Sequence, residues 1–458
     1  MLVHIAKKEA LEHLKSFRFL VAFIFIIATF SIMMFARHFE YKSKYDDYLR
    51  RIASQEESIE KYSTLDNSSA FFTQILPPSP MEIIVDPALT AVMRPEGIRS
   101  IMVQSGRSLD DNPIESINIK LDIIALVGIL GSLLALLLSY DSINREVNDG
   151  TIKLLLSSGV PRIKIILGKI LGGSLAAILP IAAIFLLTSI WMAITMGQDF
   201  GLSQWVSLLG IFLVSVIYIM LFYCLGAFVS SVILDQTLST LSCFGLWILL
   251  VIIVPVLGLY ISRSIVKVPD LGNIRRQNLA IAIEEARRIG ELRRAFQAQG
   301  LSAGEALEKA RAENKEHSEA TEARLNAMQE GFRNASAQQM RLSIRLACIS
   351  PYSIYLAAVE ELSGTGYDFG HLQNVVNNWL EIAMNYLDHQ KNEAKKRNPE
   401  FTSLDRLDLS NMPRFKYTEP TIGYKYSHAL PYILLLSAYF LLPPFLFVYA
   451  LYSKRRVF

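Results

Sequence analysis

The chain is 458 residues long, 52% of them hydrophobic and 19% charged, and its formal net charge is +3. That charge is too small to indicate a nucleic-acid binder, and three cysteines supply neither a disulfide framework nor a metal site. Several uninterrupted apolar runs are long enough to cross a bilayer, which favours a membrane protein over a set of soluble domains.

Residues 1–18 predict an amphipathic helix in the membrane interface, since apolar and charged side chains recur at helical spacing. The apolar run 19–36 follows and is about as long as a bilayer is thick. A cleaved signal peptide is the competing interpretation, because basic residues precede this run. The exit sequence Met-Met-Phe-Ala-Arg is a poor cleavage site, so we expect an uncleaved first transmembrane helix.

Residues 37–118 mix charged residues with several prolines, which indicates an insert outside the bilayer. The second span is expected at 119–140. Lys120 and Asp122 lie within the first turn of its outer end, where they can snorkel or form ion pairs. A proton relay is the alternative role for these two residues.

Residues 141–169, here named the elbow, join the second span to the third. The run Asp141–Val147 can continue the preceding helix, and Gly150 can end it in a left-handed conformation. Thr151 or Asp149 can then cap a short helix at 152–156, which is too brief to span a membrane. Five side chains make the elbow basic, namely Arg145, Lys153, Arg162, Lys164 and Lys169. These features predict a polar turn on the cytoplasmic side, and an ordinary positively charged loop is the alternative to a docking element.

Three further spans are expected within 170–261, and residues 262–428 form the largest insert. In this insert, apolar residues recur at spacings of three and four on either side of a break at 300–304. The first set is Leu279, Ile283, Ala286, Ile289, Leu292 and Phe296, and the second is Leu307, Ala310, Leu325, Met328 and Phe332. The pattern predicts two long charged helices folded back as a hairpin. Ser350-Pro351 is expected to end this hairpin, and further helix is expected at 352–385 with an interruption at 364–366.

The last span is expected at 429–452, before a basic tail at 453–458. Six spans place both termini on one side of the membrane, and basic residues at the amino terminus, elbow and tail indicate that this side is cytoplasmic. Basic residues at the outer ends of the first and fifth spans oppose this orientation, but long translocated segments are largely exempt from the charge rule. The predicted fold is an α-helical integral membrane protein with six transmembrane helices and two mainly helical extracytoplasmic inserts, the larger containing the hairpin.

No catalytic motif is present in the sequence. It contains neither the glycine-rich phosphate loop of nucleotide hydrolases nor the His-Glu-x-x-His motif of metalloproteases, and its seven histidines are scattered singly. We therefore expect no catalytic residue, no metal site and no cofactor bound by this chain.

The elbow carries an ordered set of residues: Asp141, Glu146, Gly150-Thr151, three leucines, Pro161 and Gly168-Lys169. This order resembles the permease subunits of ABC transporters of the type-2 exporter class. The Ser-Pro and Gly-Thr-Gly of the large insert resemble a subgroup with an extracytoplasmic insert before the last transmembrane helix. In that class the elbow carries a coupling helix that docks on a separate ATPase subunit. The resemblance implies an ATPase contact at Asp141, Arg145, Glu146, Gly150, Thr151, Leu154, Leu155 and Leu156.

The resemblance also implies the partners and the location. ATP and Mg would be bound by the cytoplasmic ATPase subunit, and a second copy of this chain would complete the complex in the lipid of a bacterial cytoplasmic (inner) membrane. Export of a substrate is the expected function. Two alternatives remain: mechanical driving of an extracytoplasmic protein partner without translocation, and a membrane scaffold or sensor without an ATPase.

Overall fold

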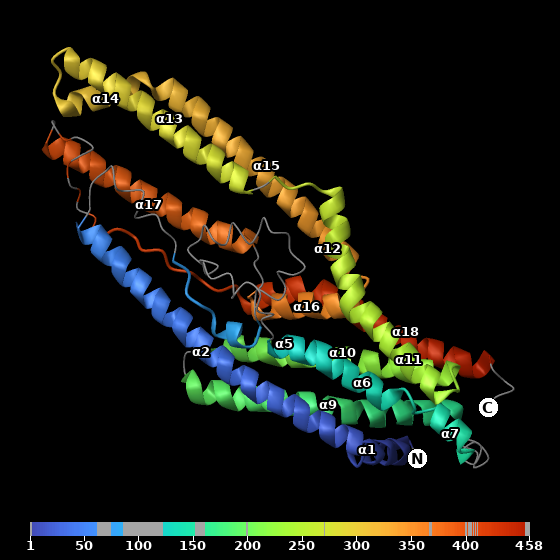
Figure 1. The fold of residues 1–458 in the computed structure, drawn as a ribbon. Coiled ribbons are helices and arrows are strands. Elements are labelled where there is room, and N and C mark those ends of the chain that lie inside the picture. The colour runs from blue at the N-terminus through green and yellow to red at the C-terminus, as the bar shows by residue number, and fades with distance from the viewer. Residues whose placement is uncertain are drawn as a thin grey trace.

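The computed structural model describes residues 2–61, 75–85, 122–151, 161–197, 200–269, 271–365, 369–398 and 411–453, together with residues 401, 405, 407 and 409. Within these ranges every regular element is a helix (Figure 1). Six helical stretches are long and apolar enough to cross a bilayer: Phe17–Ile59, Ile123–Asn148, Ile163–Thr195, Leu202–Val232, Gln236–Ile265 and Ile422–Leu446. The predicted fold class of a six-span α-helical membrane protein is confirmed.

The first span belongs to a single helix that is much longer than a bilayer is thick. Helix α2 (Phe17–Lys61) has 45 residues and joins the predicted apolar run to the charged residues beyond it. At 1.5 Å per residue it is about 67 Å long, roughly twice the thickness of the hydrocarbon core. The expected boundary after residue 36 is therefore not a break in the helix, and α2 carries the chain far beyond the first span.

A short piece of the first insert is fastened to α2 just beyond that span. The 3-10 turn η2 (Pro80–Ile83) is closed by a capping box between Ser79 and Glu82, and its apolar side chains are fully buried. Arg37 of α2 pairs with Glu40 at 2.7 Å and also donates to the backbone carbonyl of Glu82. This buried guanidinium holds the insert against the helix.

Lys120 lies outside the described residues. The Asp122 carboxylate accepts a hydrogen bond from the Ala125 amide at 2.5 Å and so caps the second span.

The second and fifth spans each contain a π-helical segment between two α-helical parts. The second is formed by α5 (Ile123–Leu126), η4 (Val127–Gly131) and α6 (Ser132–Ser139). The fifth is formed by α11 (Gln236–Trp247), η6 (Ile248–Ile253) and α12 (Val254–Ile265). A π-helical turn inside an α-helix is uncommon and is often found at functional sites.

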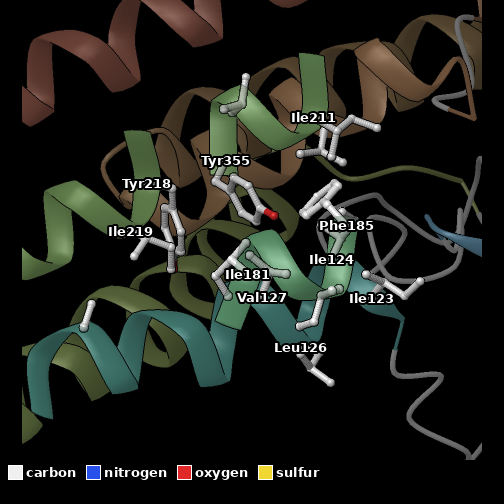
Figure 2. Packing of buried hydrophobic residues seen from close by; sticks show 14 of the residues in the cluster. Ile123, Ile124, Leu126, Val127, Ile181, Phe185, Ile211, Tyr218, Ile219 and Tyr355 are labelled. Carbon is white, nitrogen blue, oxygen red and sulfur yellow. The ribbon is translucent and has the colours of Figure 1, made fainter. Parts of the chain in front are cut away.

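The centre of the membrane domain is α10 (Leu202–Val232), which packs against α6, α9 (Arg162–Thr195), α16 (Pro351–Ser363) and α18 (Ile422–Ser453). Helix α10 contributes three fully buried rings, those of Tyr218, Phe222 and Tyr223. Figure 2 shows Tyr218 and Ile219 together with Ile181, Val127 and Tyr355, which come from α9, η4 and α16.

The predicted hairpin is present, but it consists of three helices. Helix α13 (Leu271–Ala298) turns at Gly300, whose φ of 90° suits glycine, and the chain returns through α14 (Ala303–Glu313) and α15 (Lys315–Ala347). The returning arm is interrupted at Asn314, so the prediction of two helices is wrong in this detail. We name α13, α14 and α15 together the hairpin. Leu279 and Ile283 belong to the apolar pattern that predicts the hairpin, yet they are 63% and 60% exposed.

Helix α16 lies within the residues predicted as the large insert. Residues 262–428 were all placed outside the bilayer, but α16 is buried among spanning helices and packs against α10 and α18. The last turns of α15 run beside α12, and α16 follows them and packs along α10 (Figure 1). Gly364 ends α16 with a φ of 69°, and this break agrees with the predicted interruption.

A separate small core lies outside the membrane domain. It joins α17 (Phe369–Arg397) to the far end of α2 and to the irregular segment after residue 400, through Ile59, Trp379, Ala383, Leu387, Phe401, Leu407, Leu409 and Met412. Arg414 pairs with Glu56 through two nitrogens at 2.8 and 3.0 Å, and Trp379 donates to the carbonyl of Pro413 at 3.1 Å. We name this unit the outer core.

Replacing Trp379 by alanine should unfold the outer core locally. The ring is 8% exposed and packs edge-on against Phe415, so its loss should cost about 3–5 kcal/mol. Hydrogen exchange of α17 in the purified protein measures the effect. Ile382→Ala on the same helix, where the side chain is 57% exposed, is the matched control. Equal exchange in the two variants would show that the ring does not hold the core.

Candidate functional site

The described part of the elbow is a tight turn followed by one short helix. The chain leaves α6, turns through residues 140–143 and forms α7 (Asn144–Asn148). Gly150 then adopts a φ of 73°, the left-handed conformation expected from the sequence. Residues 152–160 lie outside the described residues, and with them the predicted short helix and Leu154, Leu155 and Leu156.

A buried ion cluster holds the elbow in place. The Lys169 ammonium of α9 lies 2.9 Å from Glu9 Oε2 of α1 (Leu2–Leu14) and 3.0 Å from Glu146 Oε1 of α7. The exposed fractions of the three side chains are only 5%, 7% and 11%. One cation thus joins three elements that are far apart in sequence. Because an unpaired charge at such a buried position is costly, removing Lys169 would leave two carboxylates without their counter-charge.

Two glycines allow α1 to reach this lysine. A Cβ on Gly168 would lie 2.7 Å from Ile5 Cγ2, and one on Gly172 would collide with the backbone of Ala6. Glycines four residues apart lie on one face of a helix and permit close backbone approach. Helix α1 therefore lies directly on α9, which places Glu9 over Lys169.

The environment keeps Glu9 ionised. Burial alone disfavours the charged carboxylate, but the hydrogen bond with His13 and the charge of Lys169 outweigh it, so the pKa of Glu9 is lowered. The His13 ring also meets the Tyr223 ring of α10 edge-on. The amino-terminal helix is thus bound by charge to α9 and by aromatic packing to α10.

Two further ion pairs connect the elbow with the amino-terminal region. Asp141 pairs with Arg18 at 3.2 Å, and Arg18 also donates to the hydroxyl of Tyr140 at 2.6 Å. Arg145 pairs with Glu12 at 3.8 Å. Both of these pairs are partly exposed, so each contributes less than the buried cluster.

Polar groups of α10 and α11 hold the turn from the opposite side. The hydroxyl of Ser230 accepts hydrogen bonds from the amides of Ile143 and Asn144 at 3.1 and 3.2 Å. The hydroxyl of Ser239 donates to the carbonyl of Tyr140 at 2.9 Å. The backbone groups that a turn would leave unpaired are satisfied in this way. The elbow is consequently tied to α1, α9, α10 and α11 at once.

The residues predicted for a partner contact divide into two groups. Asp141 and Glu146 are buried and bind within the chain, whereas Arg145 and Thr151 are exposed and Gly150 is half-buried. Sequence reasoning did not find Glu9, His13 or Arg18 as part of this site. The available signal was Lys169 itself, since a lysine inside an apolar helix must find an opposite charge.

Lys169→Ala should destabilise the membrane domain by about 3–5 kcal/mol, because two buried carboxylates would be left facing each other. Thermal unfolding in detergent measures the loss, and hydrogen exchange of residues 2–14 should increase as α1 detaches. Lys164→Ala is the matched control, since Lys164 is exposed on the same helix. If both variants unfold at the same temperature, the cluster contributes nothing to stability.

A comparison with protein-family models places this geometry in context. The model described as ABC-2 family transporter protein matches residues 3–456, from α1 to the end of the last span. A comparison with curated proteins finds no match. Because the family match covers nearly the whole chain and agrees with six spanning helices, the chain belongs to the ABC-2 family of transporter proteins and is the membrane subunit of an ABC transporter.

Proposed function

We propose that the chain is an export permease whose elbow docks on a separate cytoplasmic ATPase subunit. The observation that carries this proposal is the buried contact of Lys169 with Glu9 and Glu146. A turn used only as a connection needs no charged anchor in its interior, whereas a docking element must hold its shape under load. ATP and Mg belong to the partner, and this chain supplies no cofactor ligand.

The docking surface and its support are different residues. We assign direct contact to the exposed Arg145 and Thr151, to Gly150 directly before Thr151, and to the leucines at 154–156. Asp141 and Glu146 act as positioning residues, since their carboxylates bind Arg18 and Lys169. A force on the surface would pass through these pairs to α1, α2 and α9 together.

The complex is proposed to contain two copies of this chain in a bacterial cytoplasmic membrane, with both termini cytoplasmic. The fifth span supports a second copy or lipid as its neighbour, because its apolar side chains are largely uncovered. The most exposed are Leu241, Tyr260 and Ile265, at 67%, 63% and 66%. A path between the two copies would then carry the substrate.

Mechanical driving of an extracytoplasmic protein is the second candidate. It is favoured by the length of the hairpin. Helix α13 has 28 residues and follows α12 of the fifth span, and α15 has 33 residues and packs against α12. A plain export path does not require such a lever. This view also fits the subgroup with a large insert before the last span. Membership of the ABC-2 family implies an ATPase partner and so supports both of these candidates over the third, a scaffold without an ATPase.

Gly150→Val should release the ATPase subunit. Valine is strained at a φ of 73°, and a Cβ there meets nothing within 4 Å, so the change acts through the backbone of the elbow alone. The chain is expressed with its natural neighbours and purified in detergent, and co-purifying ATP hydrolysis is measured. We expect a loss of about tenfold, which corresponds to about 1.4 kcal/mol, and a similar loss for Glu146→Ala.

Gly300→Val is the matched control, because Gly300 has a φ of 90° and an open environment in the hairpin turn. It should retain the ATPase. If no ATP-hydrolysing subunit accompanies even the unaltered chain, the proposed function fails.

Shortening the hairpin separates export from mechanical driving. Asn314 and Ser318 of the returning arm both donate to the Glu285 carboxylate, so residues 286–317 can be replaced by a short Gly/Ser linker without disturbing α12 or α16. In a mechanical device, ATP hydrolysis by the complex continues while binding of the extracytoplasmic partner is lost. Loss of efflux with no partner effect indicates export.

A further inference from the structure

Both π-helical segments contact the same short stretch, where α15 ends and α16 begins. This turn, Ser350–Tyr352, is here named the tip. The Ser350 hydroxyl donates to the carbonyl of Leu250 in η6, and it accepts from the amides of Tyr352 and Ser353 at 3.1 and 3.3 Å. The tip is therefore anchored on the fifth span by the same side chain that caps α16.

The tip also rests on η4 of the second span. A Cβ on Gly128 would lie 2.5 Å from Cε2 of the Tyr352 ring, so the glycine leaves space that this ring fills. The Gly128 carbonyl accepts from the Tyr218 hydroxyl at 2.8 Å and from the Ser132 hydroxyl at 2.5 Å. The tip thus contacts η4 through the Tyr352 ring, and Tyr218 of α10 binds the carbonyl of the same glycine.

Aromatic rings extend this contact into the bundle. Tyr355 of α16 stacks on Tyr218 with ring centres 4.4 Å apart, and its hydroxyl lies 2.9 Å from that of Ser215. Trp247, directly before η6, donates to Ser132, directly after η4, at 2.9 Å. The two π-helical segments are consequently linked to each other as well as to the tip.

Helices α15 and α6 connect this contact region with the hairpin and with the elbow. From the tip, α15 runs back along α12 toward the far end of the hairpin. Ala347 packs against Gly258, and Gln339 donates to the carbonyl of Val266. From η4, α6 runs to the elbow. Figure 1 shows α16 between these two routes.

We infer that the tip, seated on η4 and η6, is the contact through which the elbow and the hairpin change conformation together. Both spans carry a register irregularity at the point of contact, and a shifted π-helical turn supplies the discrete second packing that such coupling requires. The inference deepens the proposed function, since it names the residues that would carry motion from the ATPase side to the outer side.

Coupling between two sites is reciprocal, which makes it measurable in the chain alone. The elbow is perturbed by Glu146→Gln, which weakens the pair with Lys169, and exchange is read at residues 340–349. The hairpin is perturbed by Asn314→Ala, which removes the bond to Glu285, and exchange is read at residues 144–149. Each change should accelerate exchange at the distant segment by about fivefold or more.

Ser350→Ala and Gly128→Ala should each reduce both distant effects to less than about twofold. Gly245→Ala is the matched control, because Gly245 lies in the same pair of spans with nothing within 4 Å of an added Cβ. It should leave both effects intact. Should Gly128→Ala fail to fold, Ser350→Ala carries the test, since it removes a single hydroxyl.

Two results overturn the inference. One is that Glu146→Gln changes exchange only in α1, α7 and α9; the other is that distant effects persist in Ser350→Ala. Neither depends on ATPase binding, so a chain that couples its two ends but retains no ATPase would refute the proposed function and leave the tip assignment standing.

Discussion

The position of the elbow depends on one ammonium group. Lys169 is the meeting point of α1, α7 and α9, and its ammonium pairs with two carboxylates at hydrogen-bond distance. The cluster is buried, so its strength does not fall with ionic strength as that of a surface pair does. The close approach at Gly168 and Gly172 is what brings the first carboxylate into range. Helix packing and charge pairing therefore require each other here.

Buried polar contacts also specify the packing at the centre of the membrane domain. Three buried polar groups on α10 each bond to a neighbouring element: Ser215 to Tyr355, Tyr218 to Gly128, and Ser230 to the elbow turn. In a lipid environment hydrophobic burial gives little preference among apolar partners, so close packing and polar contacts specify which helices meet. Helix α10 is thus the element that α6, α16 and the elbow all contact.

The sequence predicts the spans well because their apolar runs meet a length requirement set by the bilayer. It predicts Gly150 and Gly364 as helix ends because left-handed backbone strongly favours glycine. It does not predict the burial of α16, whose 13 residues are too few to span and include Glu360 and Glu361. Only the contacts with α10 and α18 reveal its burial.

Long-range pairing is the second limit. The pattern of α1 predicts an amphipathic helix, but nothing near Glu9 in the chain indicates that Lys169, 160 positions away, is its partner. In the hairpin, the spacing of Leu279 and Ile283 fits a helix seam, yet the periodicity cannot show which face meets α14. Helical periodicity gives the existence of a face, and tertiary contacts decide its use.

The unbroken length of α2 has a geometric consequence for the outer part of the molecule. About 37 Å of this rod extends past residue 36, and its far end is clamped to the outer core by Arg414 and Glu56. If the rod tilts by about 10°, that end sweeps sideways by roughly 6 Å. Tilt of a spanning helix responds to the thickness of the surrounding bilayer. A change in the tilt of the first span would therefore move the outer core, and bilayer thickness would contribute to its position.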